Sequence, residues 1–99
     1  MKKVVLAPGW NGGSYQIEGK QISFKKERTY NANINGTDVV CFVKTTHDYD
    51  SDHGHRYDWN RQDLYFNVSV LGIITEIPAL PYIQKGLFLI NEESLFIGN

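Results

Sequence analysis

The sequence predicts an all-β domain with seven or eight mainly antiparallel strands, arranged as a small barrel or a two-layer sandwich with one long polar loop. Residues 63–77 form the longest apolar, β-prone stretch, and two glycine-containing pairs between apolar residues predict hairpins. A helical period is confined to about one turn. With 99 residues, 41% hydrophobic and 21% charged, residues 1–99 have the composition of a single globular domain.

The N-terminal part is predicted to supply the first strands. A short strand is expected over residues 3–7, followed by a turn rich in glycine. Gly19 and Lys20 then fit the centre of a type II′ turn. The register that follows sets Ile17 opposite Ile22, which places the apolar residues of this hairpin on one face.

Asn35 and Gly36 give the stronger hairpin signal, because both residues tolerate the positive φ that a type I′ turn requires. A turn at this position pairs Tyr30 with Cys41 and directs both side chains inward. We therefore interpret Cys41 as a small buried hydrophobic residue and not as a reactive thiol.

Residues 63–77 are predicted to form the central strand. Even positions up to Val70 are apolar, and at Gly72 the apolar set moves to odd positions, which predicts a bulge where the strand changes face. Prolines end this strand. A final hairpin of residues 87–90 and 94–97 is expected to complete the fold.

Charge and cysteine content narrow the expected partners. The net charge of −1 makes nucleic acid an unfavoured partner, although basic residues gather early, at Lys20, Lys25, Lys26 and Arg28. A single cysteine forms no intramolecular disulfide and favours a reducing compartment. The apolar run after the first lysines is too short for a signal peptide or a membrane span. We expect a cytoplasmic protein without a membrane partner.

The segment from residue 47 to residue 61 is the candidate functional loop. It holds all three histidines, together with four aspartates, several aromatic residues and two arginines. Long loops in compact domains are often functional, and Tyr, Trp and Arg dominate binding hot spots. The predicted partner-binding residues are Trp10, Tyr49, Arg56, Tyr57, Trp59 and Arg61. Capping of the core is the alternative for Trp10, and anchoring of the loop is the alternative for Trp59.

A metal site is the main chemical alternative within this loop. In an extended conformation His53 and His55 point to one side and would share zinc or iron, with Asp58 or His47 as a third ligand. Alternating aspartates resemble the start of a calcium loop, but the glycine and glutamate that such a loop requires are missing. Because only two imidazoles have a spacing that suggests a shared face, we predict no bound metal and no cofactor.

These observations predict a small non-enzymatic module, accessory or inhibitor-like as in phage-encoded proteins, that binds another protein through residues 47–61. Missing phosphate-loop and nucleophile-elbow motifs favour a non-enzymatic role. Two alternatives stay open. One is a metal-binding protein or metal-dependent enzyme that uses His53 and His55. The other is a homo-oligomer that binds a small ligand, such as a nucleotide, in a pocket lined by the basic early strands.

Overall fold

The computed structural model describes residues 1–9 and 14–95, and within these residues the predicted all-β class is confirmed. Nine strands are present there, and all paired strands are antiparallel. Trp10, one of the predicted binding residues, lies outside the described residues.

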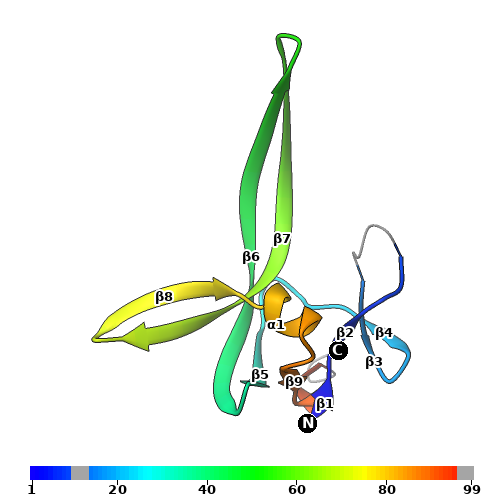
Figure 1. Cartoon of the computed structure of the whole chain (residues 1–99), viewed down its shortest axis with the longest axis vertical. Helices are drawn as coiled ribbons and strands as arrows, with labels where there is room; N and C mark the ends of the chain where they lie inside the picture. The colour runs from blue at the N-terminus through cyan, green and yellow to red at the C-terminus, as the bar shows by residue number, and fades with distance from the viewer. Residues whose placement is uncertain (10–13, 96–99) are drawn as a thin grey trace.

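Six of the strands form the larger sheet, in the order β1-β9-β5-β6-β7-β8 (Figure 1). They are β1 (Lys2–Lys3), β5 (Thr29–Ile34), β6 (Thr37–Asp52), β7 (His55–Val70), β8 (Ile73–Pro78) and β9 (Phe88–Ile90). The smaller sheet has the order β2-β3-β4, with β2 (Val5–Leu6), β3 (Tyr15–Ile17) and β4 (Lys20–Ile22). The single strand expected at residues 3–7 is therefore wrong, because the chain passes from one sheet to the other at the buried Val4.

Side chains from both sheets form one hydrophobic core. Its buried members are Val4, Ile17, Tyr30, Ala32, Ile34, Cys41, Leu64, Phe66, Ala79, Ile83, Phe88, Ile90 and Leu95. The Tyr30 ring packs edge-to-face on Phe24 at 5.0 Å, and its buried hydroxyl accepts a hydrogen bond from the Lys25 amide at 2.7 Å. The phenol oxygen thus has a partner, as a buried polar group requires.

The hairpin at Asn35 and Gly36 forms in the predicted register. Both turn residues have positive φ, 51° and 89°, and Tyr30 lies opposite Cys41. Cys41 is fully buried, and burial raises the pKa of its thiol to about 12. The thiolate, which is the nucleophilic form, is therefore scarce at neutral pH.

The first hairpin turns one residue earlier than predicted. Glu18 and Gly19 are the central residues, with φ of 49° and 82°, and Tyr15 lies opposite Ile22. A turn of type I′ requires positive φ at both central residues. Gly19 takes the second of these positions, so Glu18 becomes the first. Ile17 is still buried, opposite the exposed Lys20.

The predicted central strand is two strands, because Leu71 and Gly72 form a turn with φ of 53° and 80°. β7 and β8 pair antiparallel across this turn, with Val70 opposite Ile73. Opposite residues share a face of the sheet. Across the turn, an even-numbered residue of β7 therefore lies opposite an odd-numbered residue of β8. The shift of the apolar residues from even to odd positions, which suggested a bulge, is instead caused by the reversal of the chain.

The C-terminal part also differs from the prediction. The chain after β8, where the prolines predict an extended or turning link, forms a short helix, α1 (Leu80–Gln84), which tolerates a proline in its first turn. The expected last hairpin is wrong within the described residues, because a 3₁₀ helix, η1 (Glu92–Leu95), follows β9. The Asn91 side chain accepts a hydrogen bond from the Glu93 amide at 3.1 Å and favours this turn over a second strand.

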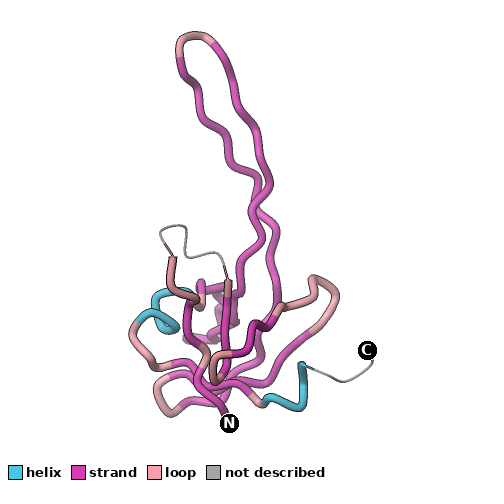
Figure 2. Tube along the Cα trace, turned by 90° about the vertical axis from the view of Figure 1, so that its right-hand side faces the viewer, coloured by secondary structure: helices cyan, strands magenta, loops and turns pink. Residues whose placement is uncertain are grey.

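The long polar loop is instead a two-stranded ribbon. β6 and β7 stay paired beyond the core pair Val43 and Leu64, out to Asp52 and His55. We call residues 44–63 the arm, and the rest of the described chain the body. Figures 1 and 2 show the arm projecting from the body. The loop prediction failed because the arm has no apolar alternation, which was the signal used to find strands.

Candidate functional site

The arm is a regular antiparallel hairpin with a tight turn at its tip. Its pairs run from Lys44 opposite Asp63 to Asp52 opposite His55. The two turn residues are His53 and Gly54, with φ of 48° and 81°. Glycine accepts this backbone without strain, whereas histidine reaches it less often.

Residues alternate between the two sides of the ribbon, so the pairing defines two faces. The aromatic face carries Lys44, Thr46, Asp48, Asp50, Asp52, His55, Tyr57, Trp59, Arg61 and Asp63. The network face carries Thr45, His47, Tyr49, Ser51, Arg56, Asp58, Asn60 and Gln62.

On the network face, one carboxylate contacts two basic side chains. His47 Nε2 lies 3.0 Å from Asp58 Oδ1, and Arg56 Nε donates to the same oxygen at 3.0 Å. His47 Nδ1 lies 3.2 Å from Asn60 Oδ1. The Arg56 guanidinium is also positioned over the Tyr49 ring, 4.4 Å from its centroid. These contacts connect the two strands, because His47 and Tyr49 belong to β6 whereas their partners belong to β7.

The same contacts set the protonation of His47. Its pKa is raised above the ordinary 6.5, first by the hydrogen bond to Asn60 and then by the hydrogen bond to Asp58, with the nearby charges of Asp58 and Asp48 adding to the shift. Each ring nitrogen faces an oxygen acceptor, and only the imidazolium form can donate from both nitrogens. The network face therefore favours a charged His47.

On the aromatic face, two large rings stay exposed. Tyr57 is 57% exposed and Trp59 is 45% exposed. Neither ring takes part in the aromatic or cation–π contacts found within residues 1–9 and 14–95. Asp50 and Asp48 are their cross-strand neighbours. The arm thus presents an aromatic pair beside carboxylates, the composition of a binding surface for a partner with basic and apolar groups.

Charged contacts gather at the base of the arm, and one of them reaches the body. Within the arm, Arg61 donates to Asp63 through Nε and Nη2, at 3.0 and 2.9 Å. Lys44 Nζ lies 2.6 Å from Glu76 of β8 and 5.2 Å from the centroid of the Tyr65 ring. Lys44 therefore joins the base of the ribbon to the β7–β8 hairpin.

The predicted binding residues are thus separated by the register. Tyr57, Trp59 and Arg61 lie on the aromatic face, whereas Tyr49 and Arg56 lie on the network face. Trp59 lies in mid-arm, opposite Asp48, and the alternative that it anchors the segment to the body gains no support from this position. The sequence supplied the residue types, but only the pairing separates the two groups.

The candidate metal ligands do not converge. His47 contacts Asp58, whereas His53 Nε2 lies at the tip, 3.3 Å from Asp52 Oδ1. His53 and His55 are not in one extended segment, because the chain reverses between them. In the described part of the chain, no group of three or more His, Cys, Asp or Glu side chains is placed to hold a metal ion.

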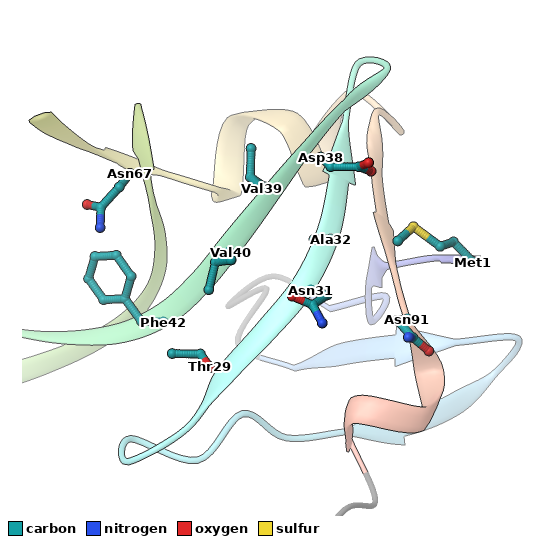
Figure 3. Close-up of a pocket in the computed structure, with 10 residues that line it drawn as sticks. All are labelled: Met1, Thr29, Asn31, Ala32, Asp38, Val39, Val40, Phe42, Asn67 and Asn91. Atoms are coloured by element: carbon teal, nitrogen blue, oxygen red, sulfur yellow. The ribbon is translucent and has the colours of Figure 1, made fainter. Parts of the chain in front are cut away.

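A separate groove of about 770 Å³ lies on the body (Figure 3). It is lined by Met1, Thr29, Asn31, Ala32, Asp38, Val39, Val40, Phe42, Asn67 and Asn91. These described lining residues include amides and one carboxylate but no Lys or Arg. The basic residues proposed for a shared pocket are elsewhere, with Lys20 and Lys25 at a hollow of about 460 Å³ beside Leu95.

The prediction from sequence missed an exposed aliphatic surface at the β7–β8 turn. Val70, Leu71, Ile73 and Ile74 are 59%, 98%, 69% and 70% exposed. We call these four residues the aliphatic tip. A run of aliphatic residues around a lone glycine was the available signal, but a central strand would have buried the same residues.

Comparison of the chain with protein-family models, with curated proteins and with solved structures finds no match. Among the helices of the described residues, none has the length and apolar character needed to cross a bilayer.

Proposed function

We propose that this chain is a small non-enzymatic protein-binding module, which engages a partner protein through the aromatic face of the arm. The observation that carries the proposal is the exposure of Tyr57 and Trp59 side by side on a ribbon that projects from the body. A residue that only stabilised the fold would pack against the core. These two rings are instead exposed on the arm, where another molecule can contact them.

The two faces of the arm support different roles. On the network face the charges of Arg56 and Asp58 are paired with each other, and the Tyr49 ring is already in contact with Arg56. Tyr49 is 62% exposed, so exposure alone does not separate the faces. On the aromatic face, however, the carboxylates outnumber the cationic side chains, and the Tyr57 and Trp59 rings take no part in the ring contacts found within the described residues. We therefore assign partner contact to the aromatic face and support of the ribbon to the network face.

The groove on the body is a candidate site for the small-ligand alternative, but its lining restricts the chemical class of ligand. Nucleotide phosphates are usually bound by Lys, Arg or a backbone anion site. The described lining of this groove offers amides, a carboxylate, a hydroxyl and the Phe42 ring instead, and in the smaller hollow the carboxylate of Glu92 shares the lining with Lys20 and Lys25. A protein partner at the arm therefore has the better support, because the arm combines exposed aromatic rings with an excess of carboxylates on one face.

Matched arm variants test the proposal in extracts of cells that naturally contain the chain. Tagged wild-type protein, Trp59→Ala with Tyr57→Ala, and Tyr49→Ala are used as baits, and the captured proteins are identified by mass spectrometry. A partner lost with the double variant is then purified and its affinity measured by calorimetry. Loss of a hot-spot aromatic residue is expected to weaken binding by roughly 30-fold or more.

Tyr49→Ala is the control, because it removes a ring that matches Tyr57 in size and exposure from the opposite face of the same ribbon. We expect it to change the affinity much less than the double variant does. Circular dichroism of each bait shows whether the body remains folded. Equal binding by all three baits, or equal loss from both faces, would contradict the proposed role of the aromatic face.

A further inference from the structure

The outer side of β8 is an open edge of the larger sheet. β8 is last in the strand order, and within residues 1–9 and 14–95 its ladder partner is β7. In Figure 1 the β7–β8 hairpin projects from the body at an angle to the arm. Exposed aliphatic edges are sites of strand addition, and natural proteins usually protect them with charges, bulges or covering segments.

The ladder fixes which β8 groups point outward. The Ala79 amide donates to the Leu64 carbonyl at 2.9 Å, just beyond the end of β8. Antiparallel ladders alternate between hydrogen-bonded and non-hydrogen-bonded pairs. Every second residue counted back from Ala79, including Ile77 and Ile73, therefore also directs its backbone N–H and C=O groups toward β7. The N–H and C=O groups of Ile74 and Glu76 consequently point away from β7 and form the free edge.

We propose that this edge, together with the aliphatic tip, pairs with the same edge of a second copy of the chain to form a two-fold dimer with a continuous sheet. This inference is independent of the proposed role of the arm. A two-fold axis requires antiparallel pairing of β8 with itself. Its occupant must therefore supply the same backbone groups and side chains that β8 presents.

One register satisfies these conditions best. With the axis at Thr75, Ile74 of one copy faces Glu76 of the other, so the outward donors and acceptors meet in two symmetric pairs. A shift toward Glu76 sets two carboxylates opposite each other and requires a donor from Pro78, which has none. A shift toward Ile74 pairs Glu76 with the turn residue Gly72, outside the strand.

The cross-strand side-chain pairs also favour this register. Ile73 then lies opposite Ile77 of the second copy, and Thr75 faces Thr75, a favourable cross-strand pair. Leu71, 98% exposed in the turn, extends past the last pair of this register, Ile73 with Ile77, toward the end of β8 in the second copy.

Charge is also compatible with pairing to a second copy, because like charges on the two edges would repel each other. Glu76 is the only ionisable side chain of β8, and Lys44 of its own chain neutralises it at 2.6 Å. The edge thus brings no unpaired charge into the contact. About ten residues a side take part, against about 20–30 in an interface of standard size, so we expect a weak dimer whose population rises with concentration.

The mass of the full chain in solution, followed by analytical ultracentrifugation from micromolar to millimolar concentration, tests the dimer. Ile74→Pro removes an outward N–H while leaving the donors that face β7 in place. We expect it to weaken dimerisation at least about tenfold. Val40→Lys places a charge on an exposed aliphatic residue of the body, away from β8, and should leave the dimer unchanged.

A cysteine at the axis tests the register. Directly opposite residues in a non-hydrogen-bonded pair have Cα atoms about 4.5 Å apart, within the range that a disulfide spans. Thr75→Cys should therefore cross-link two chains under mild oxidation, whereas Thr37→Cys, exposed at another hairpin, should not. The native Cys41 is fully buried and does not compete.

Several outcomes would overturn the inference. These are a monomer at every concentration, equal cross-linking of both cysteine variants, or an Ile74→Pro protein that dimerises like wild type. A monomer that binds neutral phospholipid vesicles through the aliphatic tip would assign these residues to a lipid surface instead. A wild-type dimer sensitive to Ile74→Pro but not to Val40→Lys, with cross-linking at Thr75→Cys alone, is the expected result.

Discussion

β6 and β7 each belong to two regions with different sources of order. In the body, Cys41 and Phe66 face each other and are 0% and 3% exposed. In the arm, Asp50 faces Tyr57 and both are exposed. The backbone pairing is the same in the two regions, but only the body gains stability from removing apolar surface from water.

This contrast shows that the ribbon is held by its turn and by cross-strand contacts. Hairpins of two strands are at best marginally stable in isolation. The arm compensates through the His47, Asp58 and Arg56 contacts on its network face and through its attachment to β6 and β7 of the body. We therefore expect mutations in the body to affect global unfolding, and equivalent mutations in the arm to act locally.

The largest expected effect comes from the shared strand β7. Phe66→Ala removes a ring that packs edge-to-face on Tyr82 at 5.6 Å in the core. We expect it to lower the free energy of unfolding by about 3–5 kcal/mol. Tyr57→Ala, in the arm half of the same strand, should change it by no more than about 0.5 kcal/mol. Urea unfolding followed by circular dichroism distinguishes the two, and similar losses would show that the arm and the body unfold as one unit.

A smaller effect is expected from a matched pair of turn glycines. Gly36 in the body and Gly54 in the arm have φ of 89° and 81°, and an added Cβ would meet nothing within 4 Å at either position. Valine at either site therefore introduces backbone strain without a steric clash. Gly36→Val should destabilise the body by about 1–3 kcal/mol, whereas Gly54→Val should open the arm tip and leave the global midpoint unchanged.

Hydrogen exchange resolved by residue measures this difference. Gly54→Val is expected to speed exchange in the outer part of the arm only, while Gly36→Val speeds exchange throughout the body. A global midpoint lowered equally by both variants would contradict the separation between the two regions. An unchanged midpoint in Gly36→Val would instead show that the body tolerates strain at its best-defined turn.

The difference in burial between the body and the arm also explains which parts of the fold could be predicted from the sequence. The turn at Asn35 and Gly36 was predicted in its correct register because both residues favour positive φ and the flanking strands alternate. Leu71 and Gly72 were missed, because leucine rarely adopts positive φ and the aliphatic residues around it suggested burial. Periodicity reports burial, so it identifies strands only where one face enters a core.

The candidate site was predicted in composition but not in geometry. Aromatic and basic residues at 49–61 indicated a binding segment, and the structure places them on an exposed ribbon. Their division into two faces depends on the turn at His53 and Gly54, because a shift of one residue would exchange the partners across the ribbon. Histidine before glycine was a weak turn signal, and the surrounding polar residues gave no second indication of the register.

The smallest expected effect is the pH dependence of the network face. Hydrogen bonds to Asn60 and Asp58 raise the pKa of His47 above its ordinary 6.5. The contact therefore stabilises the arm fully below the unfolded-state pKa, and this stabilisation is lost as the pH rises through the folded-state pKa. The free energy of global unfolding should hardly change when His47 titrates, because His47 is exposed and lies in the arm.

Nuclear magnetic resonance of the His47 ring protons measures this pKa directly. Asp58→Asn removes the charge but keeps a polar side chain of similar size, and it should lower the pKa of His47 toward the ordinary value. Asp38→Asn, which changes a carboxylate bonded to Asn33 in the body, is the matched control and should leave the pKa of His47 unaltered. Equal pKa values in wild type and Asp58→Asn would show that the network face does not order the arm through this carboxylate, and the arm's stability would then depend on backbone pairing and the contact between Arg56 and Tyr49.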